Sequence, residues 1–502
     1  MSNPSLAAQI AHLALNTFDT LPKKCKPRVQ ADGRQEWTPM SAVILSRHDT
    51  TALLNSDAAS CSTEHDLKII CLATGTKSLP VSALPRCNGL VLHDCHAEIL
   101  ALRGFNYWLL CEVERMLAGE GNVSPWLERR EQYIADTMQA VEPGDGCQLP
   151  YRLRQDVEIS LFSTEAPCGD ASMELLMKAA EAAGRDVSPW AAAPAASQPL
   201  NDSDSKQRSG SDTCEDHENA KLPPGRGYFS NLGALRRKPA RADAEISMSR
   251  SCSDKLMLKQ FTGLLSFPLD LLIERTDAAY LSRMVVYQDQ HNRQGYERAF
   301  DKQGRLREAV KSSHDGQSEA RFFEVEVLPK GFRRFEFEKA VSREDVIMQE
   351  NKKPSNISTI WIAGDDENGS VVEVLVNGVK QGYKQFDHRE SKASVVCRRK
   401  LLEKATRVDQ LLKADFVKRG MRQDPSRIAH YSEIKSMPQR HPRRHLKQRV
   451  FDALGGWPSK GLDDDFNITS LSQSITDSTL SYPYLPMFSC TGFSNPAAYH
   501  FA

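Results

Sequence analysis

The 502-residue sequence lacks the features that would direct it into a membrane or out of the cell. No apolar run approaches the roughly 20 residues that a membrane helix needs. The N-terminal stretch MSNPSLAAQIAHLALNTF has no basic segment before its apolar residues, so it does not resemble a secretory signal. The 12 cysteines form no paired framework of the kind found in disulfide-rich secreted chains. We therefore expect an intracellular protein, in the cytoplasm or the nucleus, whose thiols are buried or bind metal.

The sequence also lacks a net charge, because 65 Lys and Arg residues balance 65 Asp and Glu residues. Any affinity for a polyanion must therefore be local. Positive charge gathers between Arg398 and Arg449, where 16 Lys and Arg residues accompany only 5 Asp and Glu residues and 3 histidines. Such a segment is often just a solvated helical surface. The scarcity of acidic residues here favours contact with a polyanion.

The hydrophobic pattern alternates between strands and helices. Apolar spacing from Ser5 to Phe18 predicts an amphipathic helix that packs on the main core. Predicted elements further along are strands at 37–45, 66–74 and 157–163, a helix at 93–111, and a hairpin formed by 358–363 and 370–378. Repeated strand–helix succession predicts an α/β layer architecture with ligands at the strand ends.

The segment 189–244 departs from this pattern, because it is poor in large apolar groups and rich in Ser, Asp, Pro and Gly. It cannot bury enough surface to offset the entropy of ordering, so we predict a disordered insertion. The insertion separates residues 1–188 from residues 245–475, and residues 476–502 form a tail of unknown role. The two longer parts carry all the motifs described below.

The triplet His96-Ala97-Glu98 matches the first half of a hydrolytic nucleobase deaminase site, H-x-E. In such a site the imidazole is a neutral nitrogen ligand to Zn²⁺, and the glutamate moves protons without binding the metal. A triplet alone is a weak signal in a chain of this length, so its meaning depends on accompanying motifs.

Residues 167–172, PCGDAS, supply one such motif, although Ala171 stands where P-C-x-x-C would have its second cysteine. The proline before Cys168 favours a first helical turn, where exposed N–H groups lower a thiol pKa. The alternative is a buried structural cysteine. A catalytic zinc needs three protein ligands, so a third must come from elsewhere. Among the other cysteines, Cys252 in SCSDK also opens a predicted helix, with a hydroxyl cap and an acidic first turn.

The motifs DCHAE, PCGDAS and SCSDK, in this order, resemble the adenosine-deaminase domain shared by double-stranded-RNA editing deaminases and eukaryotic tRNA-specific adenosine deaminases. The resemblance implies a cytidine-deaminase-like three-layer core, with a mixed sheet between helices, elaborated into one large editase domain. It implies His96, Cys168 and Cys252 as zinc ligands. It also implies Glu98 as the proton shuttle of a hydrolase that acts on an amidine carbon–nitrogen bond.

Further stretches extend the resemblance over nearly the whole chain, namely LPKKCKP, EWTPMSAVIL, TGTKSLP, IWIA, YSEIKS and GGWPSKGLDDDF. It begins near Ser5, which leaves no room there for a double-stranded-RNA-binding domain, so it favours the tRNA-specific branch of eukaryotes, and of fungi in particular. That branch implies conversion of adenosine to inosine in tRNA, at adenosine 37 beside the anticodon of alanine tRNA. The alternatives are double-stranded-RNA or mRNA editing, deamination of cytidine or a free nucleoside, and a non-catalytic zinc-containing RNA-binding module.

The resemblance also implies a buried inositol hexakisphosphate. Its candidate contacts, by motif position, are Thr76, Lys77, Arg103, Lys255, Arg398, Lys435, Trp457 and Lys460. The match is partial, because Leu102 precedes Arg103 where editing relatives have a basic pair, and Leu258-Lys259 replaces their Arg-Trp. The alternative is that these residues form ordinary salt bridges or face RNA.

Overall fold

The computed structural model describes most of the chain between residues 4 and 466. The described residues are 4–29, 31, 35–48, 65–119, 123–130, 149–182, 184, 231–238, 245–311, 320–339, 352–364, 369–387, 389–418, 431–435, 441–454 and 466. Trp457, Lys460 and the predicted tail at 476–502 lie outside them. Within these residues no helix combines the length and the apolar character needed to cross a bilayer.

One mixed sheet of eight strands organises the fold, in the order β10-β9-β7-β1-β2-β11-β12-β13. The strands are β1 (Met40–His48), β2 (His65–Thr74), β7 (Val157–Ser163), β9 (Leu281–Tyr287), β10 (Glu324–Leu328), β11 (Ser358–Ile362), β12 (Val371–Val376) and β13 (Val379–Lys380). The β10, β9 and β7 strands run parallel, and the remaining neighbours are antiparallel. Residues before and after the predicted insertion thus share one sheet.

Alternating side chains of the central strands serve two hydrophobic layers, as the period of two in a strand requires. On β1, Ala42 and Ile44 pack with Phe18 of helix α1 (Leu6–Thr20), which contacts β2, β7, β9 and β10. Val43 and Leu45 pack in the opposite layer, beneath helix α2 (Ala97–Ala118), which contacts β1, β2 and β11. The sheet therefore lies between helices, and the predicted α/β class with a mixed central sheet is confirmed.

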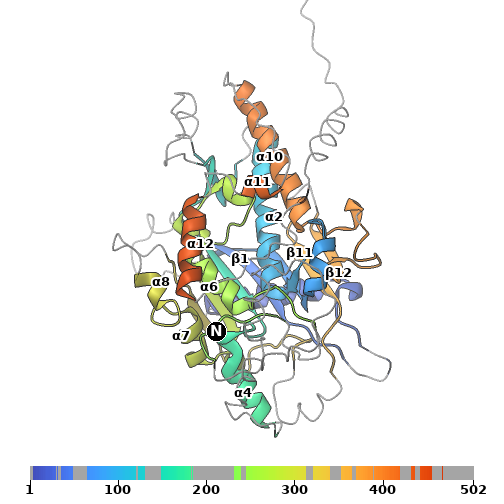
Figure 1. Ribbon diagram of the computed structural model, residues 1–502, viewed down its shortest axis with the longest axis vertical. Coiled ribbons are helices and arrows are strands. Elements are labelled where there is room, and N and C mark those ends of the chain that lie inside the picture. The colour runs from blue at the N-terminus through green and yellow to red at the C-terminus, as the bar shows by residue number, and fades with distance from the viewer. Residues whose placement is uncertain are drawn as a thin grey trace, which may run out of the picture.

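Figure 1 shows the remaining helices around the sheet and α2. They are α4 (Met173–Ala182), α6 (Cys252–Thr262), α7 (Arg293–Phe300), α8 (Arg307–Lys311), α10 (Arg398–Lys418), α11 (Tyr431–Lys435) and α12 (His441–Ala453). The long α10 runs beside α2, and α12 lies against α6. Two small sheets complete the described fold, one of β3 (Thr76–Ser78) with β4 (Asp94–His96), the other of β5 (Leu127–Arg129), β6 (Tyr151–Leu153) and β8 (Ile273–Glu274).

Several predicted elements need correction. The helix expected at 93–111 begins only at Ala97, because Asp94–His96 pair with β3 as strand β4. The predicted hairpin is confirmed by the antiparallel pairing of β11 with β12, although its turn at 365–368 lies outside the described residues.

The prediction of disorder at 189–244 is wrong for residues 231–238. Arg236 and Lys238 are buried, and the backbone of this stretch pairs with residues 247–251. The composition did not indicate this ordered stretch, because hydrogen bonds and an ion pair order it instead of apolar groups. The other residues of the predicted insertion lie outside the described residues.

Candidate active site

His96 and Glu98 lie at the junction between β4 and α2. His96 ends the strand and occupies the N-cap position of the helix, with extended backbone angles. Its backbone N–H donates to Oδ1 of Asp94 at 3.1 Å. Glu98 follows in the first turn of α2 and is only 3 % exposed. A strand-to-helix turn thus presents an imidazole while burying the carboxyl group two residues later.

Cys168 lies in the turn after β7, not in a first helical turn as its preceding proline suggested. A short 3-10 helix, η4, begins only at Asp170, and α4 begins at Met173. Gly169 has a φ of 106°, a region that L side chains rarely adopt. The turn needs this conformation because it runs against Ser251 at the start of α6.

Cys252 is the first residue of α6, as the sequence predicted. Ser251 caps the helix, since its hydroxyl accepts from the Asp254 N–H. The same helix start holds the Cys168 turn, because Ser253 donates through its backbone N–H to the Cys168 carbonyl at 3.0 Å and through its hydroxyl to the Pro167 carbonyl at 3.0 Å. Two motifs far apart in the sequence thereby become one packed unit.

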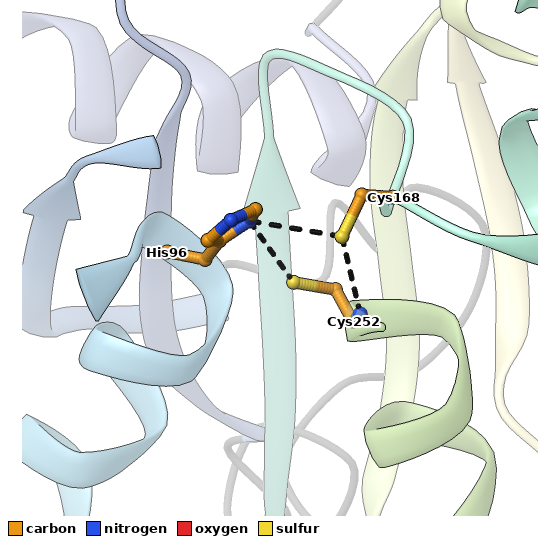
Figure 2. Close-up of side chains that lie close together, drawn as sticks. All are labelled: His96, Cys168 and Cys252. Carbon is orange, nitrogen blue, oxygen red and sulfur yellow. Dashed lines mark hydrogen bonds between the residues drawn. The ribbon is translucent and has the colours of Figure 1, made fainter. Parts of the chain in front are cut away.

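Figure 2 shows the imidazole of His96 facing both sulfurs. Its Nδ1 lies 3.7 Å from the Cys168 Sγ and 3.6 Å from the Cys252 Sγ. The candidate ligand atoms of the three residues lie within 4.8 Å of one another. The structure therefore brings together His96, Cys168 and Cys252, while Ala171 lies buried and donates its N–H to the Ser253 hydroxyl.

The surroundings favour a thiolate at Cys168. A hydrogen bond with the Cys252 thiol holds the pKa of Cys168 well below its usual value, although burial opposes this. The Lys238 ammonium and the neighbouring His96 ring also lower the Cys168 pKa, and the backbone N–H of Cys252 points at its sulfur at 3.3 Å. Burial and the neighbouring sulfur raise the pKa of Cys252.

Glu98 has the character of an acid–base group. Burial, followed by the nearby Cys168, raises its pKa above the ordinary value. Its Oε2 is buried and has no hydrogen-bond partner among the described residues. A buried carboxyl group without a partner is costly, so an oxygen held in this way beside three candidate ligands is available for chemistry.

Asp94 and Lys238 also surround the thiols, although the sequence motifs assigned neither residue a role. The Lys238 ammonium donates to the Cys252 sulfur at 3.4 Å and to both oxygens of Asp94, at 3.0 and 2.8 Å. Lys255 also pairs with Asp94. Burial opposes ionisation of Asp94, but the two lysines outweigh it and hold its pKa well below the usual range. The only sequence signal for Lys238 was the basic run Arg236-Arg237-Lys238 inside the predicted insertion.

The residues predicted to contact a polyphosphate fall into separate places. Thr76 and Lys77 pair across β3 and β4 with His96 and Cys95, so they lie beside the ligand group. Lys255 contacts Asp94, as described above. Lys435 lies on α11 with its ammonium 5.9 Å from the ring centre of Tyr431.

Arg103 belongs to a group of neighbouring cations. Its guanidinium donates to the Val396 carbonyl, and its pKa is lowered by burial and then by the charge of Arg398. The pKa of Lys259 on α6 is held well below its usual range by burial and then by Arg443 and Lys447 of α12. The sequence signal for Arg443 and Lys447 was the basic excess after Arg398, whereas Lys259 stands at a motif position where the residues depart from those of editing relatives.

An α/β fold that gathers a histidine, two cysteines and a buried glutamate defines the class of hydrolytic nucleobase deaminases. A model of the adenosine-deaminase (editase) domain matches residues 71–461. The chain belongs to this adenosine-deaminase (editase) domain family and is a deaminase enzyme.

The chain is similar to proteins named tRNA-specific adenosine deaminase 1. The Schizosaccharomyces pombe protein is 29% identical over 411 residues, which cover 82% of this chain and 87% of that protein. The Saccharomyces cerevisiae protein is 30% identical over 265 residues, covering 53% and 55% of the two chains. The double-stranded RNA-specific editase B2 of Rattus norvegicus is 31% identical over 106 residues, which cover only 21% of this chain and 12% of the editase.

Gly169→Ala should disrupt the docking of the Cys168 turn. An added Cβ would lie 2.3 Å from the Ser251 hydroxyl oxygen, in addition to the strain of the positive φ. The matched control is Gly184→Ala, which has a φ of 62° but no heavy atom within 4 Å of the added Cβ.

We expect Gly169→Ala to lower the free energy of unfolding by more than the roughly 1–2 kcal/mol that left-handed strain costs in the control. Denaturant unfolding measures this difference, and metal analysis should show less bound metal in Gly169→Ala. Equal stability and metal content in the two variants would contradict the docking.

Proposed function

We propose that the protein is a zinc-dependent hydrolase that converts adenosine to inosine in tRNA, at adenosine 37 of alanine tRNA. The observation that carries this proposal is the convergence of His96, Cys168 and Cys252 beside the buried carboxyl group of Glu98. The similarity to tRNA-specific adenosine deaminases over most of the chain supports tRNA as the substrate. The match to a double-stranded RNA editase covers only 21% of this chain, so it gives weaker support to duplex RNA as the substrate.

The three side chains fit a catalytic zinc ion. One imidazole nitrogen and two sulfurs are preferred zinc donors, and three protein ligands leave a position for water. Among the described residues, only this group of His, Cys and acidic side chains could hold a metal ion. When bound, zinc supplies a Lewis acid that makes a water molecule a hydroxide source near neutral pH.

Glu98 performs the proton transfers of the proposed reaction. Its carboxylate accepts a proton from the attacking water, and its raised pKa lets the neutral acid persist long enough to return that proton. That first proton goes to the N1 atom of adenine. Glu98 then takes the second proton of the water from the new hydroxyl group on C6 and passes it to the amino group, which departs as ammonia. The amino group leaves C6, a carbonyl oxygen replaces it, and adenosine becomes inosine.

An anticodon loop suits this buried site as a substrate. Adenine C6 cannot be reached inside a stacked helix, so the base must be flipped into the pocket. Bases of a loop are already partly unstacked, and their extrusion costs less than that of a paired base. Thr76 pairs with His96 across the β3–β4 ribbon, so the two side chains lie on the same face of the ribbon.

We further propose that the cation group around Arg103 and Lys259 holds inositol hexakisphosphate as a structural cofactor. Burial and then Arg398 lower the pKa of Arg103, and burial and then Arg443, which pairs with Asp270, lower the pKa of Lys259. Neighbouring buried cations of this kind are costly unless anions compensate them. A polyphosphate neutralises several of them at once through charge-assisted hydrogen bonds. Of the other predicted contacts, Lys435 lies on α11 beside Tyr431.

Glu98→Gln should reduce inosine formation by at least about 100-fold, the lower range for loss of a general acid–base group, while zinc stays bound. Purified protein is incubated with an alanine tRNA transcript, and the product is sequenced for A-to-G conversion. Glu112→Gln is the control, since Glu112 is also buried on α2 but pairs with Arg115.

A double-stranded RNA substrate, assayed in parallel, separates the tRNA proposal from RNA editing. Zinc-loaded wild-type protein that leaves every adenosine of the tRNA unchanged would overturn the proposal. Conversion of the duplex alone would reassign the substrate.

Lys259→Met and Arg103→Met should each reduce the amount of inositol hexakisphosphate that protein produced in a eukaryotic host releases on denaturation. The compound is quantified by ion-exchange chromatography. Arg407→Met on α10 is the control, because Arg407 is largely exposed and pairs with Glu114. Wild-type protein that releases none of the compound would refute the cofactor assignment.

A further inference from the structure

Each of the two site cysteines is followed, two residues later, by an aspartate that is fully buried. Asp170 follows Cys168 and Asp254 follows Cys252, and both aspartates are 0 % exposed. Neither carboxylate is among the candidate metal ligands. Burying a carboxylate is very costly unless charged or polar partners surround it. The partners of these two aspartates therefore indicate what the pair does.

Arg298 binds the turn that carries Cys168. Its Nε donates to both carboxylate oxygens of Asp170, at 3.2 and 3.1 Å, and its Nη2 donates to the Asp170 backbone carbonyl at 2.9 Å. Glu174 holds the same guanidinium through contacts of 2.5 and 3.1 Å. The Gly233 N–H completes the shell with a 2.8 Å bond to Asp170. Side chain and backbone are both fixed two residues beyond the sulfur.

Arg305 holds the start of α6 in the same way. Its Nη1 donates to Asp254 Oδ1 at 2.6 Å, and the Arg305 side chain is only 4% exposed. The Arg236 N–H donates to the other carboxylate oxygen at 2.9 Å. Like Asp170, Asp254 therefore accepts from one arginine side chain and one backbone N–H, two residues beyond Cys252.

The two arginines belong to one rigid piece of chain. Arg298 lies on α7, and the backbone N–H of Arg305 donates to the Arg298 carbonyl at 3.0 Å, which closes a turn after the helix. Gly304 makes this closure possible, because an added Cβ there would lie 2.4 Å from the Arg298 carbonyl oxygen.

The two backbone donors, Gly233 and Arg236, likewise come from one short stretch, residues 231–238. This stretch pairs with the residues just before α6, since the Ser251 N–H donates to the Arg236 carbonyl at 2.8 Å. Two segments therefore hold both aspartates together, one through arginine side chains and the other through the backbone.

We propose that Arg298 and Arg305 are positioning residues that, through Asp170 and Asp254, fix the separation of the Cys168 and Cys252 sulfurs required by one metal ion. The proposal rests on the zinc site described above. Because both cysteine turns are bound to a single segment through Arg298 and Arg305, their separation is opposed. Neither arginine contacts a proposed ligand, so each acts only through its aspartate.

The test replaces each arginine and measures the metal site itself. Arg298→Met and Arg305→Met remove the charge and the hydrogen bonds. Arg298→Lys and Arg305→Lys keep the charge and should recover part of the effect. The matched control is Arg293→Met on the same helix, because Arg293 is exposed and its ion pair among the described residues is the one with Glu297 along the helix.

In each protein, the loss of zinc to a chelator is timed, and the visible absorption of the Co²⁺-loaded form is recorded. Removing groups that orient metal ligands typically costs about 10–100-fold in metal affinity. We expect a chelator to remove zinc about 10–100-fold faster from the Met variants, with altered cobalt bands. The control should match the wild type.

The outcomes separate this proposal from the function on which it rests. Variants that unfold at lower temperature but keep the wild-type cobalt spectrum and zinc-loss rate would overturn it, since the arginines would then be merely structural. Wild-type protein that binds no Co²⁺ would overturn both the zinc site and the positioning role. Shifted spectra in a protein that forms no inosine would leave the positioning role standing and remove only the proposed reaction. If a Met variant does not fold, the Lys variant carries the same comparison.

Discussion

Two backbone N–H groups in the first turn of α6 donate to Cys168, one to its sulfur at 3.3 Å and one to its carbonyl oxygen at 3.0 Å. The rest of the site depends on this contact between turns that are 84 residues apart in the chain. It places Cys252 beside Cys168, and it requires Gly169, whose backbone no larger residue could follow. His96 then meets both sulfurs from the end of β4. Because the helix start stabilises negative charge, the same contact that joins the turns also favours thiolate.

Glu98 differs from the buried carboxylates around it in how fully its oxygens are paired. Asp94 lies between two lysines, and the two aspartates that follow the cysteines are paired with arginines. These pairs supply rigidity, since the removal of one partner would leave an uncompensated buried charge. Glu98 alone of these carboxyl groups keeps an oxygen without a partner among the described residues. The paired charges thus hold the site in place, whereas Glu98 is able to exchange protons.

Much of this arrangement could be predicted from the sequence, because the central strands and the cysteine at the start of α6 lie in local patterns. Strand β7 has the predicted bounds, and the helix start at Cys252 followed from its serine cap. The setting of Cys168 could not be predicted, since its turn is shaped by Ser251 across the fold. Lys238, Arg298 and Arg305 were missed for the same reason. They come from segments without a motif, and only tertiary packing brings them to the cysteines.

The central claim is that one metal ion is bound by one imidazole and two thiolates, with a position left for water. Zinc-edge X-ray absorption of the purified protein tests this most directly. The account predicts two sulfur neighbours at about 2.3 Å and two nitrogen or oxygen neighbours at about 2.0–2.1 Å, one of them exchangeable with solvent. A closed site with three or four sulfurs, or zinc without sulfur neighbours, would contradict it.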